Sequence, residues 1–417
     1  MVRLALLSVV LTVPVLPAQQ PQPLGRPIAE FAEPFSSVTG LRELSDGRVM
    51  ISDAREKLLQ LIDLRSGRAT RVGREGAGPG EYARPGALFP LPNDQTLLVD
   101  LGNMRFLRIG ADGKPIEAIS PPQLPVATPP GGQAAPAGAS MLGRLFNPRA
   151  VDAQGRLYFQ PSVFSFGDTP PADSAPIVRW TIGQSRVDSV GWVRLPAGTG
   201  GPMMVAPAGG AAARQGMVTT RMAVGSGGAS VIWTPVEIWQ VAADGRIARV
   251  SPEPYQVTWF GTDRRATAGP VVPYTPIRAT EADREAFREQ MNSGGGGPGM
   301  TITVATRTAG PPGPGAATGR GPMPDLPFAE TLPAFWEAGS VSVSPDGAVW
   351  VRRMRPARDK VPVYDVFDGS GRLVRTITLA PNSRIVGFGR TSVYVVRRDE
   401  DDLEYLQQFA RPAIGGR

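Results

Sequence analysis

Short apolar segments alternate with Gly-containing turns along most of this chain, and the alternation repeats in units of similar layout. The first unit has turns at Asp46-Gly47 and Ser66-Gly67 and four apolar segments, which are Val38–Leu44, Val49–Asp53, Leu58–Leu64 and Ala69–Val72. The two turns of each unit are about 18 to 28 residues apart, which is the length that two strands of ordinary size and their link occupy. Each unit therefore predicts a four-stranded antiparallel sheet.

The same pair of turns returns in four later units. They lie at Asn93-Asp94 and Asp112-Gly113, at Gln154-Gly155 and Gly183-Gln184, at Asp244-Gly245 and Thr262-Asp263, and at Asp346-Gly347 and Ser370-Gly371. A single four-stranded sheet cannot bury both of its faces, whereas sheets stacked radially in a propeller bury them against one another. The repeats therefore predict an all-β chain folded as a β-propeller of four-stranded antiparallel blades.

The number of blades follows from the ends of the repeated region. A sixth unit has only three apolar segments, Ile385–Phe388, Ser392–Arg397 and Glu404–Phe409, and the N-terminal Arg26–Pro34 can supply the fourth strand and close the ring. A hairpin of Met222–Thr234 with Val236–Asp244 would instead make a seventh blade. We favour six because Tyr255–Phe260 suits the third strand of the fourth unit. The predicted single domain is residues 27–412.

The spacing between units grows where tracts rich in Gly, Pro and Ala interrupt the pattern. These tracts are Pro125–Ser140, Pro196–Gly216 and Asn292–Pro324, and their low apolar content predicts mobile loops. One helix is predicted over Thr280–Gln290, with Thr280 as N-cap and Asp283 in the reciprocal position. It belongs to an insertion over residues 279–335. The insertion either packs on the rim of the propeller or acts as a lid over one end of the central channel that the blades surround.

Two residue types are missing from the composition. The chain has 417 residues with no His and no Cys, which excludes Ser-His-Asp and Cys-His catalysis, thiolate chemistry, disulfides and His-based zinc sites. Carboxylate, Lys, Tyr or Ser chemistry, a metal site with oxygen ligands, or no chemistry at all remain open.

The positive charge is spread evenly. The formal net charge is +7, and only Lys57, Lys114 and Lys360 among the basic residues are lysines. Nucleic-acid binders usually concentrate their basic residues on one face or in one run. The densest group here is only Arg352, Arg353, Arg355 and Arg358, and the other arginines are scattered along the chain. We therefore expect no nucleic-acid partner.

Residues 1–18 have the pattern of a cleaved signal peptide. Arg3 precedes an apolar run from Leu4 to Leu16, and Ala18 provides a small residue at the cleavage point. The run of about 13 residues is shorter than the ~20 that a spanning helix needs, and no Cys follows it that could carry a lipid. We therefore expect a periplasmic or secreted protein without a membrane span. We also expect the protein to be a monomer.

Two motifs resemble the NHL repeat of six-bladed propellers. The segment Leu98–Phe106 (LVDLGNMRF) is similar to the end of an NHL strand followed by Gly-Asn-x-Arg, and Gly73–Tyr82 (GREGAGPGEY) is similar to the Gly-rich link before such a blade. The link is especially like that of secreted bacterial propellers, mostly of unknown activity. The resemblance is close over residues 27–125 and looser over 335–410. It implies a structural role for Asp100, Asn103 and Arg105.

Several motifs admit both a functional and a structural interpretation. Asp53 with Arg55 repeats the Asp-turn-Arg arrangement of Asp100 and Arg105, where the carboxylate either caps backbone amides or binds a ligand. The glycines of Gly73–Gly80 suggest a phosphate loop, but the Gly-Lys-Ser/Thr ending is lacking, which favours a link between blades. The acidic run Asp399–Asp402 offers oxygen ligands for Ca²⁺, but its position between two strands favours a hairpin tip.

Ligands of propellers generally bind at a mouth of the central channel, where the chain enters each innermost strand. The candidate ligand-binding residues at such positions are Arg84, Arg149, Trp336 and Glu337. The leading hypothesis is an exported, non-catalytic binding scaffold for a protein or small-molecule ligand, with no cofactor. The alternative is a hydrolase that resembles calcium-dependent six-bladed lactonases, for which Ca²⁺ would be the cofactor. A binder of anionic polymers is the weakest hypothesis.

Overall fold

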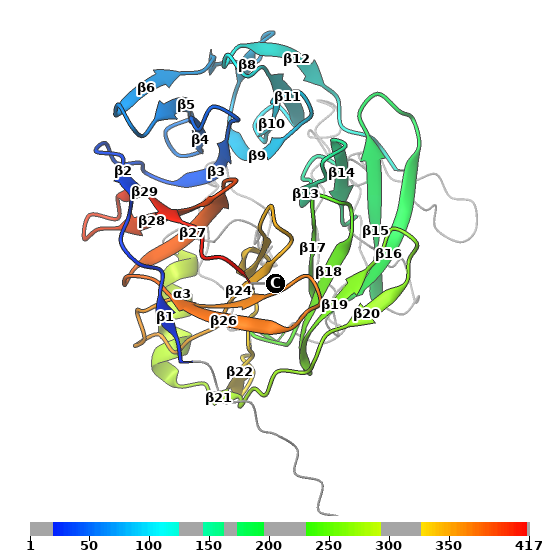
Figure 1. The fold of residues 1–417 in the computed structure, drawn as a ribbon, viewed down its shortest axis with the longest axis vertical. Coiled ribbons are helices and arrows are strands. Elements are labelled where there is room, and N and C mark those ends of the chain that lie inside the picture. Colours follow the sequence, from blue (N-terminus) through cyan, green and yellow to red (C-terminus); the bar gives the residue numbers. More distant parts are fainter. Residues whose placement is uncertain (1–19, 125–144, 162–172, 196–230, 293–326, 415–417) are drawn as a thin grey trace, which may run out of the picture.

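Six antiparallel sheets follow one another along the chain, each with its strands in meander order. The computed structural model describes residues 20–124, 145–161, 173–195, 231–292 and 327–414. Figure 1 shows the sheets arranged in sequence order around a common centre. The protein is a six-bladed β-propeller, as the repeats predict.

The first blade consists of β3 (Val38–Glu43), β4 (Val49–Asp53), β5 (Leu58–Asp63) and β6 (Arg68–Arg71), and the second of β9 (Pro85–Pro90), β10 (Thr96–Asp100), β11 (Arg105–Ile109) and β12 (Pro115–Ile119). The third contains β13 (Ala150–Val151), β14 (Arg156–Phe159), β15 (Ser174–Thr181) and β16 (Val187–Arg194), and the fourth β17 (Ile238–Val241), β18 (Ile247–Pro252), β19 (Tyr255–Phe260) and β20 (Ala266–Ala268). The fifth contains β23 (Val341–Val343), β24 (Val349–Arg352), β25 (Val363–Phe367) and β26 (Leu373–Thr378), and the sixth β27 (Ser383–Phe388), β28 (Ser392–Arg398) and β29 (Glu404–Ala410).

The turns within the blades adopt the left-handed conformations that their sequences favour. Asn93 and Asp94 join β9 to β10 with φ angles of 59° and 55°, which is the geometry of a two-residue hairpin. Gly245 joins β17 to β18 with φ of 86°. A Cβ on Gly245 would lie 3.0 Å from the guanidinium of Arg156 in the third blade. Glycine is therefore favoured there by its positive φ, while the Arg156 side chain of the neighbouring blade packs close to it.

The hydrophobic core lies between neighbouring blades. Leu97 and Phe106 of the second blade, for example, pack against Leu157 and Trp180 of the third, and none of the four is more than 4% exposed. Every residue of β4 and β10 is buried, because both faces of a second strand are covered by adjacent blades. This explains why these strands have nearly continuous apolar sequences.

The N-terminal segment closes the ring. The strand β2 (Ala29–Glu30) pairs antiparallel with β29 and so becomes the fourth strand of the sixth blade. Phe31 and Phe35 follow it and are 2% and 4% exposed. The predicted closure by Arg26–Pro34 is thus confirmed. The strand β1 (Gln22–Pro23) adds a parallel fifth strand beside β26, which the sequence pattern did not predict.

The segment considered for a seventh blade forms no blade in its described part. Residues 222–230 lie outside the described residues, and Ile232 makes an isolated parallel bridge with Phe328. The strand β19 occupies the third position of the fourth blade, as predicted. The signal-peptide prediction, and nearly all of the three predicted mobile tracts, likewise fall outside the described residues.

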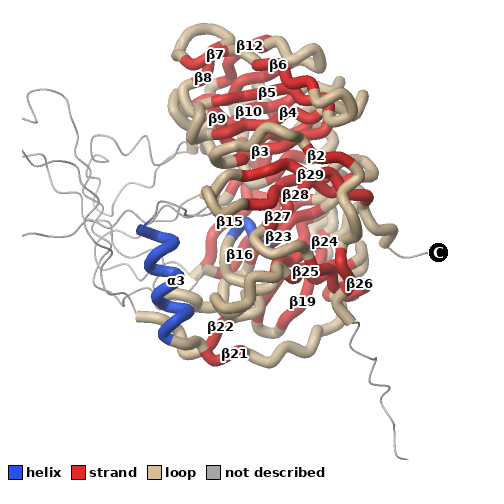
Figure 2. The backbone as a smooth tube through the Cα atoms, turned by 90° about the vertical axis from the view of Figure 1, so that its left-hand side faces the viewer, coloured by secondary structure: helices blue, strands red, loops and turns tan. Residues whose placement is uncertain are grey.

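One helix, α3 (Glu281–Asn292), lies on one side of the stacked strands, as Figure 2 shows. The predicted capping box is confirmed, because the Thr280 backbone N–H donates to the Asp283 carboxylate at 2.8 Å and the Asp283 N–H donates to the Thr280 hydroxyl at 3.3 Å. Phe287 of the helix packs on Trp233, Phe328 and Trp336. Two short strand pairs lie outside the blades. They are β7 (Arg74–Glu75) with β8 (Glu81–Tyr82), in the link between the first two blades, and β21 (Ile277–Arg278) with β22 (Thr331–Leu332), on either side of α3 in the sequence. No helix in the described part of the chain is long and apolar enough to cross a membrane.

Candidate functional site

The four candidate residues lie directly before innermost strands. Arg84 precedes β9, Arg149 precedes β13, and Trp336 and Glu337 precede the 3-10 turn η1 (Ala338–Ser340) that leads into β23. An even number of antiparallel strands returns the chain to the face from which it started, so the links between blades, with α3 among them, lie on one face of the propeller. We call this side the α3 face. Within the described residues, no hydrogen bond, ion pair or ring contact joins Arg84 or Arg149 to Trp336 or Glu337.

Arg84 contributes an exposed side chain to the α3 face. Its backbone N–H donates to the carboxylate of Asp100 at 3.2 Å, and its carbonyl accepts from Leu101 at 2.9 Å. The backbone is therefore fixed by the end of β10. The guanidinium has no hydrogen-bond or ion-pair partner among the described residues.

Arg149 is half-buried and lies across the boundary between the third and fourth blades. Its Cζ atom is 5.5 Å from the ring centroid of Trp239 in β17, a cation–π contact. Burial lowers the pKa of Arg149 from its ordinary value. No carboxylate among the described residues pairs with it.

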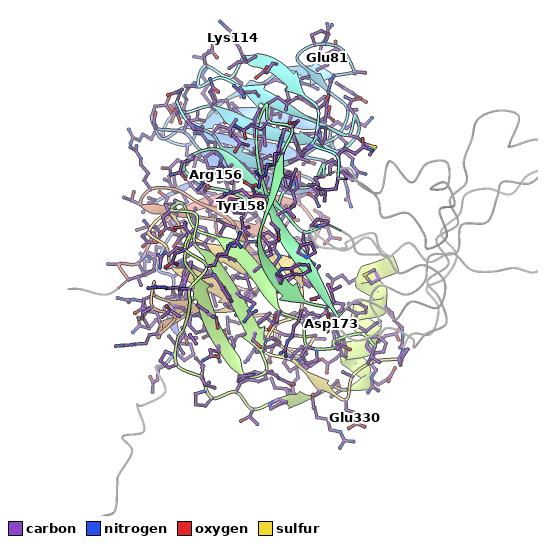
Figure 3. The ribbon with its side chains drawn as sticks, turned by 90° about the vertical axis from the view of Figure 1, so that its right-hand side faces the viewer. Glu81, Lys114, Arg156, Tyr158, Asp173 and Glu330 are labelled. Carbon is purple, nitrogen blue, oxygen red and sulfur yellow. The ribbon has the colours of Figure 1, made fainter. Side chains whose placement is uncertain are left out.

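Five other buried or half-buried arginines of the propeller each have an acidic partner at short distance. The closest atoms of these pairs are 2.6 to 3.4 Å apart, and the pairs are Arg42–Asp94, Arg105–Asp100, Arg156–Asp152, Arg353–Asp365 and Arg384–Glu404. In Figure 3, Arg156 lies beside Tyr158, whose hydroxyl donates to the same Asp152 carboxylate at 2.9 Å. Arg149 thus differs from these five arginines, because no carboxylate among the described residues pairs with it.

Trp336 and Glu337 connect the helix to the fifth blade. The Trp336 ring packs edge-on against Phe287 of α3 with centroids 5.7 Å apart. The Glu337 carboxylate accepts from the Arg352 guanidinium at 2.5 Å, and both side chains are about one third exposed. Asp283 adds a further tie, because its carboxylate accepts from the Ala357 backbone N–H at 2.6 Å. These contacts hold α3 against the loop that follows β24.

The Asp residues of the NHL-like motifs cap the backbone. Asp100 is completely buried and accepts from the backbone amides of Ala83 and Arg84 at 3.0 and 3.2 Å. Asp53 does the same for Ser36 and Ser37 at 2.7 and 3.0 Å in the first blade. Each carboxylate joins the end of the second strand to the chain that enters the first strand of its own blade. The structural interpretation is confirmed for both.

The Gly-rich segment 73–80 is a link between blades. The Asn103 side-chain amide donates to the Gly76 carbonyl at 2.9 Å, and the Arg105 guanidinium donates to the Gly78 carbonyl at 3.0 Å. Glu81 folds back to accept the Gly78 N–H at 2.8 Å, which with Arg74 lowers the pKa of Glu81. The link borders a shallow groove of about 480 Å³ with Pro115 and Ile116. Glu81 and Lys114 mark this end of the molecule in Figure 3.

Two buried acids, Asp365 and Glu404, were not singled out by the sequence. Asp365 accepts from Tyr255 at 2.8 Å and from Arg353 at 2.6 Å, and Glu404 accepts from the Val38 N–H at 2.7 Å. Both carboxylates join adjacent blades. Strand sequences such as VYDVF and EYLQQFA carry no signal for such partners, because the partners come from distant parts of the chain.

The acidic run Asp399–Asp402 forms the turn between β28 and β29. The Asp399 carboxylate accepts from the backbone amides of Asp401 and Leu403 at 3.0 and 2.9 Å. The hairpin-tip interpretation is therefore confirmed. Over the described ranges, no three acidic side chains come together in a group that could hold a metal ion.

The comparisons concern fold alone. No protein-family model matches the sequence, and no curated protein matches it either. Among solved structures, a member of the DUF4221 family from Bacteroides vulgatus is similar with 9% identity and a TM-score of 0.45, over 96% of this chain and 98% of that one. A Bacteroides fragilis protein assigned as exported has 12% identity and a TM-score of 0.44, over 95% of each chain. A gluconolactonase from Xanthomonas campestris has 10% identity and a TM-score of 0.41, over 94% of this chain and 99% of that one.

Proposed function

We propose that this chain is an exported, non-catalytic binding protein that receives its ligand on the α3 face, at the end of the propeller axis. The observation that carries the proposal is the composition of the six innermost strands. Their residues are mainly apolar or small, with Arg42 and Arg384 as the two cations, and Glu43 is their only carboxylate. Glu43 is itself engaged, because it accepts from the Tyr394 hydroxyl at 2.6 Å and from the Arg390 backbone N–H at 3.1 Å.

The engagement of the other acids supports the same proposal. A metal-dependent lactonase of this shape would need several Asp, Asn or Glu side chains converging on the axis. Asp53 and Asp100 are instead occupied with backbone amides of their own blades, and Asp365 and Glu404 with interblade partners. Arg84, Arg149, Trp336 and Glu337 are the residues that we propose to face the ligand.

The function is tested by measuring binding and turnover on the same preparation. The chain from Gln19 onward is incubated with gluconolactone and with p-nitrophenyl phosphate, each with and without Ca²⁺, and its thermal unfolding is followed with benzoate, N-acetyl-trialanine and inorganic phosphate. We expect at least one acid to raise the unfolding midpoint, because a ligand that binds only the native state stabilises it. Hydrolysis of either substrate in proportion to protein concentration would refute the proposal.

Export is tested independently of ligand binding. The full chain is expressed in a Gram-negative host, and the exported product is sequenced from its N-terminus. We expect the sequence to begin at Gln19, after removal of residues 1–18. Retention of the intact chain in the cytoplasm would contradict the proposed export and leave the binding proposal to its own test.

A further inference from the structure

The guanidinium of Arg149 is half-buried without a compensating charge among the described residues. Burying an ionised group is costly unless it is paired or hydrogen-bonded. Five buried or half-buried arginines of this propeller, Arg42, Arg105, Arg156, Arg353 and Arg384, each have a carboxylate within 3.4 Å. The face of the Trp239 ring provides a cation–π contact but accepts no N–H hydrogen bond at the edges of the guanidinium. Arg149 therefore keeps donors for an acceptor from outside the blade framework.

Gln160 supplies a second donor beside the same indole. The Trp239 Nε1–H donates to the Gln160 Oε1 at 2.9 Å. Because an indole nitrogen can only donate, this bond requires the carbonyl oxygen of Gln160 to face Trp239. The Nε2 amide of Gln160 consequently points away from the indole, and no described residue accepts from it. Trp239 is completely buried, so packing fixes its ring, and the ring in turn fixes the orientation of the Gln160 side-chain amide.

The strand register places Arg149 and Gln160 at the same end of the third blade. Ala150 pairs with Tyr158 across β13 and β14, and the Arg149 backbone N–H donates to the Tyr158 carbonyl at 2.8 Å. Gln160 is two residues beyond Tyr158 and follows the end of β14. In an antiparallel pair, Arg149 and Gln160 are then near neighbours, and both side chains contact Trp239.

We infer that the Arg149 guanidinium and the Gln160 side-chain amide form a subsite for a carboxylate group of the ligand. The inference rests on the proposed binding function and specifies its chemistry. A guanidinium edge presents two parallel N–H groups that match the two oxygens of a carboxylate. The single charge of a carboxylate balances the single unpaired cation, whereas a phosphate dianion would bring a second charge that nothing in this set neutralises.

The subsite is tested by titrating the ¹⁵N-labelled chain, from Gln19 onward, while following the indole N–H signals of its seven tryptophans. The probes are N-acetyl-trialanine as free acid and as C-terminal amide, benzoate, and inorganic phosphate. We expect the acid, but not the amide, to shift the Trp239 signal at millimolar concentrations. If benzoate also shifts it, small organic acids are ligands; if only the peptide acid does, the ligand is a peptide C-terminus.

The variants separate the subsite from the rest of the α3 face. Arg149→Ala should weaken carboxylate binding at least tenfold, roughly the loss of one bidentate charge-assisted contact. Arg149→Lys keeps the charge but not the paired donors and should give an intermediate affinity. Gln160→Glu should abolish binding, because it places a carboxylate beside Arg149. Arg55→Ala is the control, because Arg55 is an exposed arginine that follows β4 and is not among the residues proposed to face the ligand; it should leave the affinity unchanged.

Several outcomes would overturn the inference. These are equal binding of the acid and the amide, tighter binding of phosphate than of carboxylate, unchanged affinity in Arg149→Ala, and a Trp239 signal that no carboxylate shifts. If acids bind but shift other tryptophans, the proposed binding function stands and this subsite is refuted. If a substrate is instead turned over, the proposed function itself is refuted.

Discussion

The carboxylate of Asp100 accepts the backbone N–H of Ala83 at 3.0 Å, and so connects the end of β10 to the chain that enters β9 of the same blade. Asp53 makes the same connection to Ser36 in the first blade. The Asp of the NHL-like motif is therefore an internal cap of the blade. By fixing the backbone before β9, Asp100 also positions Arg84 on the α3 face.

Replacing Asp100 by Asn should destabilise the protein by about 3 kcal/mol, because it removes a buried charge that receives backbone amides and pairs with Arg105 at 3.4 Å. Asp112→Asn is the matched control, since Asp112 makes a similar local bond to Lys114 but its side chain is 58% exposed. We expect the control to change the free energy of unfolding by less than about 0.5 kcal/mol. Equal effects in urea denaturation would refute the capping role.

Gly40→Ala should be strongly destabilising. A Cβ at position 40 would lie 2.7 Å from the Gly86 carbonyl oxygen and 2.8 Å from the Leu88 nitrogen. Both are backbone atoms of β9, so relief requires the first two blades to separate, at a cost of about 3 kcal/mol. Gly191→Ala is the control, because its Cβ would meet ordinary contacts at 3.6 Å and beyond. Similar unfolding midpoints for the two variants would contradict this packing account.

Stability should fall in alkaline solution partly through Tyr158. Burial, together with the Asp152 charge, raises the pKa of Tyr158 to about 12 from its ordinary value of 10. The native state then holds a proton that the unfolded chain releases above pH 10, so this contribution is complete below about pH 10 and is lost as pH rises to about 12. The loss is on the order of 2 kcal/mol.

Tyr158→Phe removes this titration. Its unfolding free energy should depend less steeply on pH between about 10 and 12 than that of the unmodified protein, although Tyr255 and Tyr394, whose pKa values are also raised, keep some dependence in both. Denaturation series at several alkaline pH values compare the two slopes. Identical slopes would show that Tyr158 does not titrate as described.

Asp283→Ala should loosen α3 without unfolding the propeller. Burial acts to raise the pKa of Asp283, but hydrogen bonds from Thr280 and the Ala357 backbone more than offset it and hold the pKa below its ordinary value. Loss of this cap should cost about 1 to 2 kcal/mol locally. We expect faster proteolysis within α3 and little change in the unfolding midpoint. Glu285→Ala, on an exposed position of the same helix, should leave the proteolysis rate unchanged.

The sequence predicted the blades because their turns and capping motifs are local. In Asp46-Gly47 and in the Asp100-to-Arg105 segment, the residues that determine the turn lie within a few positions of one another. The strand β1 could not be predicted in the same way, because Gln22 pairs with Ile377 from the far end of the chain and a two-residue strand has no periodicity.

The candidate site was likewise only partly predictable from the sequence. The position of Arg149 before an innermost strand follows from the repeat, and it was predicted. Its contact with Trp239, about 90 residues later in the chain, the orientation of Gln160 and the lack of an acidic partner among the described residues all arise from tertiary packing. No local pattern signals these contacts, since a lone Trp in an apolar strand ordinarily indicates core packing.

Thermal unfolding of the chain from Gln19 onward, with Ca²⁺, with a chelator and untreated, tests most directly whether the protein is a binding protein or a metal-dependent hydrolase. We expect the same midpoint in all three conditions, because the buried acids Asp53, Asp100, Asp365 and Glu404 are occupied by backbone, tyrosine and arginine partners. A rise of several degrees with Ca²⁺ that the chelator abolishes would reveal a specific metal site and contradict the proposed function.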